Sequence, residues 1–119
     1  MSENAPRPWI SDDSVDPLTA LLDDLVARPL AAPFTCPVCT EPGSVHVHLH
    51  GFAGAVGGSW IWCSRCRRYD HDRRTIPAWW FNNSLIDLES LVSPPAPLDG
   101  SSDLIDQHWN LACGRGCDG

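Results

Sequence analysis

Two short cysteine pairs constrain the fold of this 119-residue chain more than any other feature. Residues 36–39 (CPVC) and 63–66 (CSRC) share the C-x-x-C spacing, and the 23 residues between them are enough for a hairpin. Each such turn places two thiolates on adjacent vertices of a metal tetrahedron, about 2.3 Å from the ion. We therefore predict one structural zinc ion, Zn2+, held by Cys36, Cys39, Cys63 and Cys66.

Free thiols or a redox pair are the alternative for these cysteines. A thioredoxin-like site needs a single C-x-x-C that opens a helix inside a βαβ unit. In this chain residues 40–43 (TEPG) follow the first pair, and such a string forms a turn rather than a helix. The spacing therefore favours metal binding, with iron left open by the same ligand set.

The two cysteine turns resemble the knuckles of zinc-ribbon (rubredoxin-like) domains, over about residues 34–69. The first turn has their CPxC form. One departure is that such knuckles often place glycine after the second cysteine, where this chain has Thr40 and Arg67. The resemblance implies a metal-stabilised β-hairpin, and the departure favours zinc over iron.

The segments around the knuckles predict a small α+β fold. Asp16-Pro17 followed by leucines at helical spacing predicts a helix over 17–27, ended by Arg28-Pro29. Residues 44–50 alternate strictly, which is typical of a half-buried strand. A returning strand over 58–62 runs into the second knuckle, a third strand is expected around 74–76, and a last helix capped by Ser102 should reach residue 112.

The alternating strand places three histidines on one face. Val45, Val47 and Leu49 occupy the other face, so His46, His48 and His50 are expected to be solvent-exposed, with a second metal site as the alternative.

Residues 51–58 contain four glycines and are expected to form a flexible loop. Residues 85–92 are apolar but ambiguous between helix and strand, and 79–81 (WWF) form the densest aromatic patch.

These elements suggest one domain between two flexible ends. We expect a flexible segment at 1–15, a zinc-ribbon-containing domain at 16–112 with its ribbon core at 34–76, and a flexible tail at 113–119. The fold class is α+β: a zinc-ribbon hairpin or three-stranded sheet flanked by an N-terminal and a C-terminal helix. Cys113 and Cys117 fall in the tail, where a redox pair or second metal clip is the alternative to no chemical role.

Charge along the chain is segregated and bears on partners. The formal charge is −7, made of about −5 over 1–43, +3 over 44–77 and −5 over 78–119. All five arginines of the middle segment lie near the second cysteine pair, but the acidic remainder repels a polyanion. The pattern favours a protein partner over nucleic acid, and the acidic chain is compatible with a basic partner. No 18-residue apolar run or signal peptide is evident, so we expect a cytoplasmic protein that does not contact a membrane.

Catalysis is not expected. Two complete C-x-x-C pairs fill all four metal positions, whereas a catalytic zinc keeps one open. The deaminase, nucleophile-elbow, phosphate-loop and H-E-x-x-H patterns are absent.

We expect the ribbon to present a partner-binding surface, because aromatic residues and arginine are enriched at binding hot spots. Its candidate residues are Trp60, Trp62, Arg65, Arg67, Arg68, Tyr69, Arg73 and Arg74. The alternative use of the cluster from Arg65 to Arg74 is nucleic-acid binding with base stacking.

A second resemblance concerns residues 58–80 (GSWIWCSRCRRYDHDRRTIPAWW) and 108–110 (HWN). Both stretches are similar to small bacterial zinc-ribbon proteins associated with toxin-immunity loci. This resemblance implies a cytoplasmic immunity protein that covers a partner toxin and performs no reaction.

Overall fold

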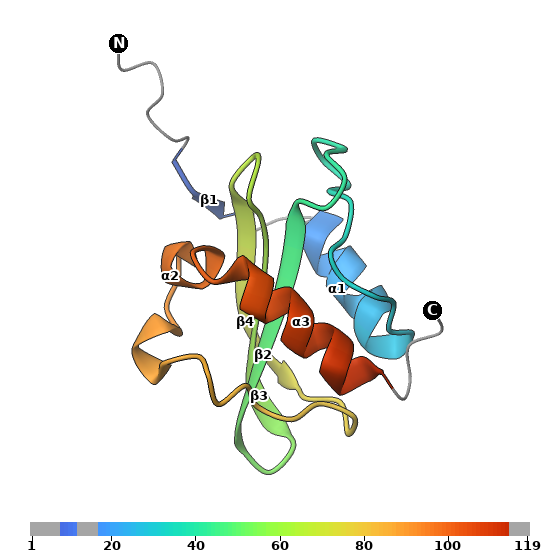
Figure 1. Cartoon of the computed structure of the whole chain (residues 1–119), viewed down its shortest axis with the longest axis vertical. Coiled ribbons are helices and arrows are strands. Elements are labelled where there is room, and N and C mark those ends of the chain that lie inside the picture. Colours follow the sequence, from blue (N-terminus) through green and yellow to red (C-terminus); the bar gives the residue numbers. More distant parts are fainter. Residues whose placement is uncertain (1–7, 12–16, 115–119) are drawn as a thin grey trace.

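The computed structural model describes residues 8–11 and 17–114, and in these the expected α+β class is confirmed (Figure 1). The sheet has the order β1-β4-β3-β2, with β1 parallel to β4 and the other pairs antiparallel. One strand more than expected is present, because Ile10 and Ser11 pair with Arg68 and Tyr69. The elements are β1 (Ile10–Ser11), α1 (Pro17–Ala27), β2 (Val45–Ala53), β3 (Val56–Cys63), β4 (Arg68–Thr75), the 3-10 helix η2 (Leu88–Ser90), α2 (Ala96–Asp99) and α3 (Ser102–Cys113).

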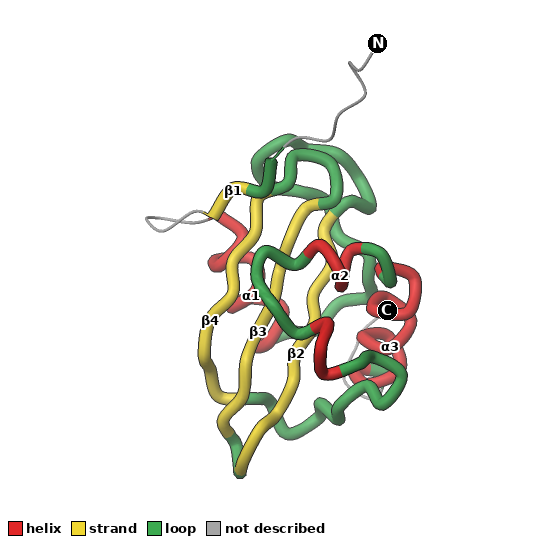
Figure 2. Tube along the Cα trace, turned by 90° about the vertical axis from the view of Figure 1, so that its left-hand side faces the viewer, coloured by secondary structure: helices red, strands yellow, loops and turns green. Residues whose placement is uncertain are grey.

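Helix α1 covers one face of the sheet and has the predicted bounds. Its leucines 18, 22 and 25 recur at helical spacing and are buried against the face that carries Val47 and Ile61. Burial of each such side chain stabilises the fold by about 1.5–3 kcal/mol. This stripe therefore fixes α1 behind the sheet (Figure 2).

The histidine face of β2 is covered by protein, which corrects the expectation that it is exposed. His46 and His48 are only 6% and 1% exposed, and His50 is half-buried. Each buried imidazole lies beside an indole of β3: His46 beside Trp62 at 5.7 Å and His48 beside Trp60 at 5.8 Å, between ring centroids. Leu98 of α2 and Ile105 of α3 close this second layer of the core. Strands β2 and β3 are thus buried on both faces over most of their length, whereas β4 is half-buried or exposed.

The glycine-rich stretch is mostly strand, so the expectation of a flexible loop over 51–58 is wrong. The turn is confined to residues 54–55, and Gly54 adopts a left-handed φ of 59°. Gly57 pairs with Gly51 across the hairpin, where a Cβ atom at Gly57 would lie 2.1 Å from the His50 carbonyl oxygen. Glycine is required there by close backbone approach, not by flexibility.

The C-terminal segment is less regular than its apolar pattern suggests. Within 85–92 the structure has only η2, and α3 begins at Ser102 with Ser101 in the cap position. Trp109 of α3 is fully buried and donates its Nε1–H to the Leu30 carbonyl at 2.8 Å. None of the described helices is long and apolar enough to cross a bilayer.

Candidate metal centre

The hairpin brings the two cysteine turns to one end of the sheet. Phe34 and Val45 exchange backbone hydrogen bonds of 3.1 and 3.0 Å, so the chain after the first turn returns directly into β2. Val45 in turn pairs with Cys63, the last residue of β3. Strand register therefore places the second turn beside the first.

The four predicted thiols form one cluster. The Sγ atoms of Cys36, Cys39, Cys63 and Cys66 all lie within 4.8 Å of one another. The Cys36–Cys66 pair is 3.9 Å apart and the Cys39–Cys63 pair 3.6 Å. A tetrahedral ion with metal–sulfur bonds of about 2.3 Å has sulfur–sulfur edges of about 3.8 Å. The cluster is therefore compatible with a single metal ion of the zinc type.

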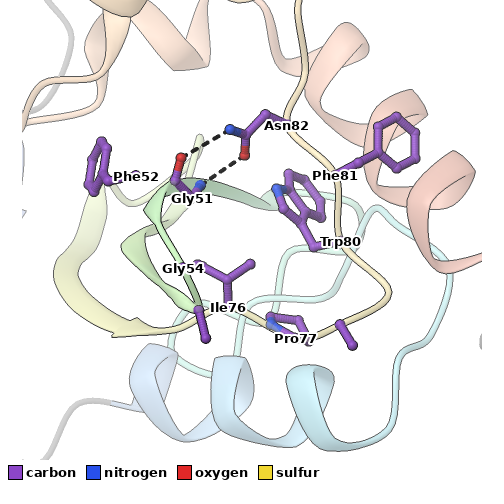
Figure 3. A pocket seen from close by; sticks show the side chains of 10 residues that line it. Gly51, Phe52, Gly54, Ile76, Pro77, Trp80, Phe81 and Asn82 are labelled. Atoms are coloured by element: carbon purple, nitrogen blue, oxygen red, sulfur yellow. Dashed lines mark hydrogen bonds between the residues drawn. The ribbon is translucent and has the colours of Figure 1, made fainter.

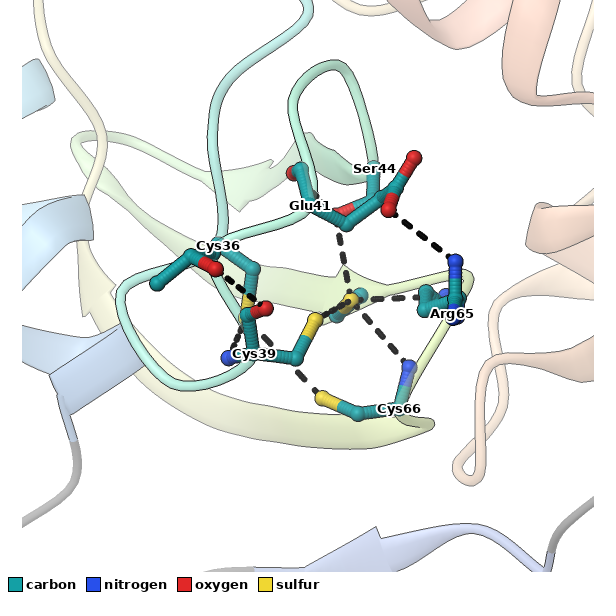
Figure 4. Close-up of polar contacts among 8 residues, drawn as sticks. Cys36, Cys39, Glu41, Ser44, Arg65 and Cys66 are labelled. Carbon is teal, nitrogen blue, oxygen red and sulfur yellow. Dashed lines mark hydrogen bonds and ion pairs between the residues drawn. The ribbon is translucent and has the colours of Figure 1, made fainter.

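Backbone amides hold the first sulfur of each turn (Figure 4). Cys36 Sγ accepts hydrogen bonds from the N–H groups of Val38 and Cys39 at 3.3 and 3.4 Å. Cys63 Sγ accepts the equivalent pair from Arg65 and Cys66, both at 3.3 Å. N–H donors stabilise a thiolate, the form that binds metal. Both turns are thus arranged for anionic sulfur.

Thr40 and Arg67 adopt the left-handed conformation that glycine favours. Their φ angles are 62° and 65°. Each donates its N–H back to the first cysteine of its turn, at 2.9 Å from Thr40 to Cys36 O and 3.0 Å from Arg67 to Cys63 O. A left-handed φ costs a residue with a Cβ about 1–2 kcal/mol. The knuckle geometry is therefore retained without the glycine that such turns often use.

The thiols have unequal acidities. Burial raises the pKa of Cys36, and it raises that of Cys66 to about 12. Burial also acts to raise the pKa of Cys63, but hydrogen bonding with Ser44 and from the amides of Cys66 and Arg65 lowers it to about 7. Four sulfurs this close together, three of them on buried residues, cannot all ionise without a compensating cation. A divalent ion supplies that charge, so the donor set fits a metal.

The indoles expected on the partner-binding surface lie in the core. Trp60 and Trp62 are 1% and 0% exposed, which corrects the expectation that the ribbon presents them. Their Nε1–H groups donate to Val92 O at 3.2 Å and to Asp99 Oδ1 at 3.0 Å. Neither ring can stack on a base or on a partner side chain without unfolding this layer.

Three of the arginines expected on the same surface contact their own chain. Arg65 Nη1 lies 3.0 Å from Glu41 Oε1, joining the two knuckles, and Arg74 Nη1 lies 3.1 Å from Asp23 Oδ1. The Arg67 guanidinium lies 4.6 Å from the ring centroid of Trp9, which also packs edge-on against Tyr69. Arg68 and Tyr69 are half-buried and Arg73 is exposed. The arginines do not converge on a common site.

The other candidate ligands stand apart from the thiol cluster. Within residues 8–11 and 17–114, no second group of histidine, cysteine and acidic side chains is close enough to hold a metal. His46 instead places Nδ1 2.8 Å from Asp106 Oδ1. Cys113 is fully buried at the end of α3 and is disulfide-bonded, and Cys117 lies outside the described residues.

Asp99 and Ser44 support the centre and were not identified from the sequence. Asp99 accepts hydrogen bonds from Trp62 Nε1 and from the hydroxyl of Ser64, inside the second turn. Ser44 Oγ lies 3.2 Å from Cys63 Sγ and donates to the Glu41 carbonyl at 2.9 Å. The only sequence signal was that Ser64 adjoins Cys63, whereas Ser44 is five positions after Cys39. Asp99 is 33 positions away from its nearest ligand and carried no signal.

No protein-family model, curated protein or solved structure matches this chain. The likeness to zinc ribbons therefore rests on the two cysteine turns themselves. The geometry defines a module with a four-cysteine cluster, compatible with a metal ion, at one end of a four-stranded mixed sheet.

Proposed function

We propose that this chain is a non-catalytic, cytoplasmic protein-interaction module folded around one structural zinc ion. The observation that supports metal binding is that four thiol sulfurs lie within 4.8 Å of one another. When bound, the ion would stabilise the folded state only, and structural zinc contributes about 10–16 kcal/mol of apparent binding free energy. Small domains are stable by about 5–15 kcal/mol in total. Metal binding and folding are therefore expected to be one event.

The donor set supports a structural rather than a catalytic role. All four ligands are cysteines drawn from two complete turns, and structural zinc sites are closed in this way. Three of the four are buried, and the fourth, Cys39, is half-buried. A closed site leaves no coordination position for water or substrate.

A protein partner is favoured over nucleic acid by charge and by burial. The chain carries a formal charge of −7. Nucleic-acid binding through the ribbon would need exposed aromatic rings, and Trp60 and Trp62 are buried. Arg65 and Arg74 are paired with acidic side chains of the same chain. The nucleic-acid alternative therefore lacks two of its three candidate stacking rings, and the third, Tyr69, is half-buried.

The resemblance to proteins of toxin-immunity loci suggests what the partner is. An acidic inhibitor suits a basic toxin, because complementary charge accelerates association and suppresses wrong partners. Co-expression with a toxin encoded beside the gene should restore growth if the hypothesis is correct. Unchanged killing would contradict the immunity role and leave the metal centre unaffected.

The metal is tested by elemental analysis of the purified chain. We expect one zinc per chain, loss of zinc and of tertiary structure with a chelator, and recovery of both when zinc is restored. Cys36→Ser should lose the metal, whereas Val38→Ser, a change in the same turn at a non-ligand, should keep it. A chain that is metal-free and fully folded with chelator present would contradict the proposal.

A further inference from the structure

An apolar groove runs along the C-terminal half of the molecule, away from the metal centre. Its first part is a hollow of about 510 Å³ between the β2–β3 hairpin and the segment 76–82, with Phe52, Ile76 and Phe81 around it (Figure 3). Ala78 and Phe81 also line a second hollow of about 450 Å³, which reaches Leu111 of α3. Leu111 in turn lines a third, of about 110 Å³, together with Leu85 and Leu104. The three neighbouring hollows, which share lining residues, are together called the groove.

The groove exposes large apolar side chains to solvent. Phe52 is 65% exposed, Phe81 50%, Leu85 70% and Leu111 69%. No Asp, Glu, Lys or Arg lines any of the three hollows, although charged residues make up 19% of the chain. Single exposed apolar residues are ordinary, but a continuous exposed apolar patch marks an interaction site.

Acidic residues predominate around the groove, although Arg73, beside Asp72, lines a neighbouring hollow that shares Phe52 with the first one. The segment 78–114, which forms most of it, contains five acidic residues and neither lysine nor arginine. Asp103 is exposed on the same ridge of α3 as Gln107 and Leu111, at successive four-residue steps. Asp87 and Glu89 are exposed in the connection before α2. An apolar groove in this setting is complementary to an apolar segment that carries positive charge.

We propose that this groove docks a basic, amphipathic segment of a partner protein, whose apolar side chains enter the hollows while its lysines or arginines face the acids. The inference rests on the proposed protein-interaction function and names its surface. A second copy of this chain is disfavoured as occupant because each copy carries −7 and the groove segment has no cation. Arg65 and Arg74 of a second copy would have to leave Glu41 and Asp23.

The test uses a synthetic peptide with leucines at helical i, i+3, i+4 spacing and lysine elsewhere. Its control peptide replaces lysine by glutamate. Binding of each to the zinc-loaded full chain is followed by two-dimensional NMR. We expect the lysine peptide to shift the signals of Phe81, Leu85 and Leu111 saturably, and the glutamate peptide to shift none. Shifts scattered over β4 or the knuckles instead would overturn the proposal.

A matched pair of variants separates groove contact from general charge attraction. Leu111→Asp adds a charge inside the groove, and Leu30→Asp adds the same charge at a leucine that is 53% exposed and lines none of the three hollows. We expect Leu111→Asp to weaken peptide binding about tenfold or more, the effect typical of an interface anchor, and Leu30→Asp to leave it within about twofold. Equal weakening by both would overturn the groove.

Two further measurements distinguish the competing explanations. Sedimentation of the wild-type chain should show a monomer, and a dimer abolished by Leu111→Asp would make a second copy the occupant. Zinc content and the thermal midpoint of Leu111→Asp should match those of the wild type, since this side chain is 69% exposed. If a partner toxin binds Leu111→Asp as tightly as the wild type, the groove is wrong while the proposed function stands.

Discussion

Replacing His48 should remove a specific part of the acid sensitivity of this protein. Its imidazole is 1% exposed, lies between Trp60 and Trp80 at 5.8 and 6.0 Å, and neither ring nitrogen has a hydrogen-bond partner in the described structure. Burial, together with the smaller effect of the nearby His50 and His108, lowers the pKa of His48 from 6.5 to about 3. The folded state therefore holds this side chain neutral.

The sign and size of the effect follow from linkage. Below pH 6.5 the unfolded chain takes up a proton on His48, and the folded chain does not until about pH 3. Stability is therefore lost as the pH falls through this window. At pH 5.5 the unfolded imidazole is about nine-tenths protonated, and the loss relative to pH 7.5 is about 1.4 kcal/mol.

The assay is urea denaturation of the zinc-loaded wild type and of His48→Leu at both pH values. Leucine is close in volume and removes no hydrogen bond, so we expect similar stability at pH 7.5 and a relative gain of about 1.4 kcal/mol for the variant at pH 5.5. The wild type and His48→Leu are compared at the same pH, so the contribution of cysteine protonation to stability is the same in both and cancels in the difference. Val47→Ala, a buried change on the same strand without a titrating group, should show a difference that does not depend on pH. A pH-independent difference for His48→Leu would refute the argument.

Three further substitutions test the fold around the centre by thermal or urea denaturation. Thr40→Gly should stabilise the zinc-loaded chain by about 0.5–1 kcal/mol, because it relieves the left-handed φ of 62°; equal or lower stability would contradict the strain. Gly57→Ala should destabilise by about 3 kcal/mol, since its Cβ would meet the backbone of the facing strand, whereas Gly54→Ala has open space and should cost about 1 kcal/mol. Asp99→Ala should cost about 1–3 kcal/mol, because it leaves the buried Trp62 N–H unpaired; a neutral result would mean that water replaces the carboxylate.

Local sequence patterns predicted those structural features that depend only on residues close together in the chain. The leucine spacing gave α1 its correct bounds, since a helix buries residues that recur every three or four positions. The bounds of β2 to β4 were less well predicted, because a glycine in the sequence can indicate either a flexible loop or close contact between two backbones. At Gly57 the reason is close contact with the backbone of the facing strand, which can be recognised only once that strand is in place. The groove was missed because exposure of an apolar residue depends on what packs over it. Leu111 gave one hint, as an apolar residue off the buried stripe of its helix.

The sequence by itself determined the cysteine cluster and the hairpin that closes it, because two turns of fixed spacing leave few ways to bring four sulfurs together. Only the tertiary structure decided which surfaces remain in water. Alternation along β2 separates histidines from aliphatic residues but does not say whether the histidine side is covered. Packing of α2 and α3 covered it, buried Trp60 and Trp62, and left Phe81 and Leu111 outside. Burial is a property of contacts between distant segments, and no local period encodes it.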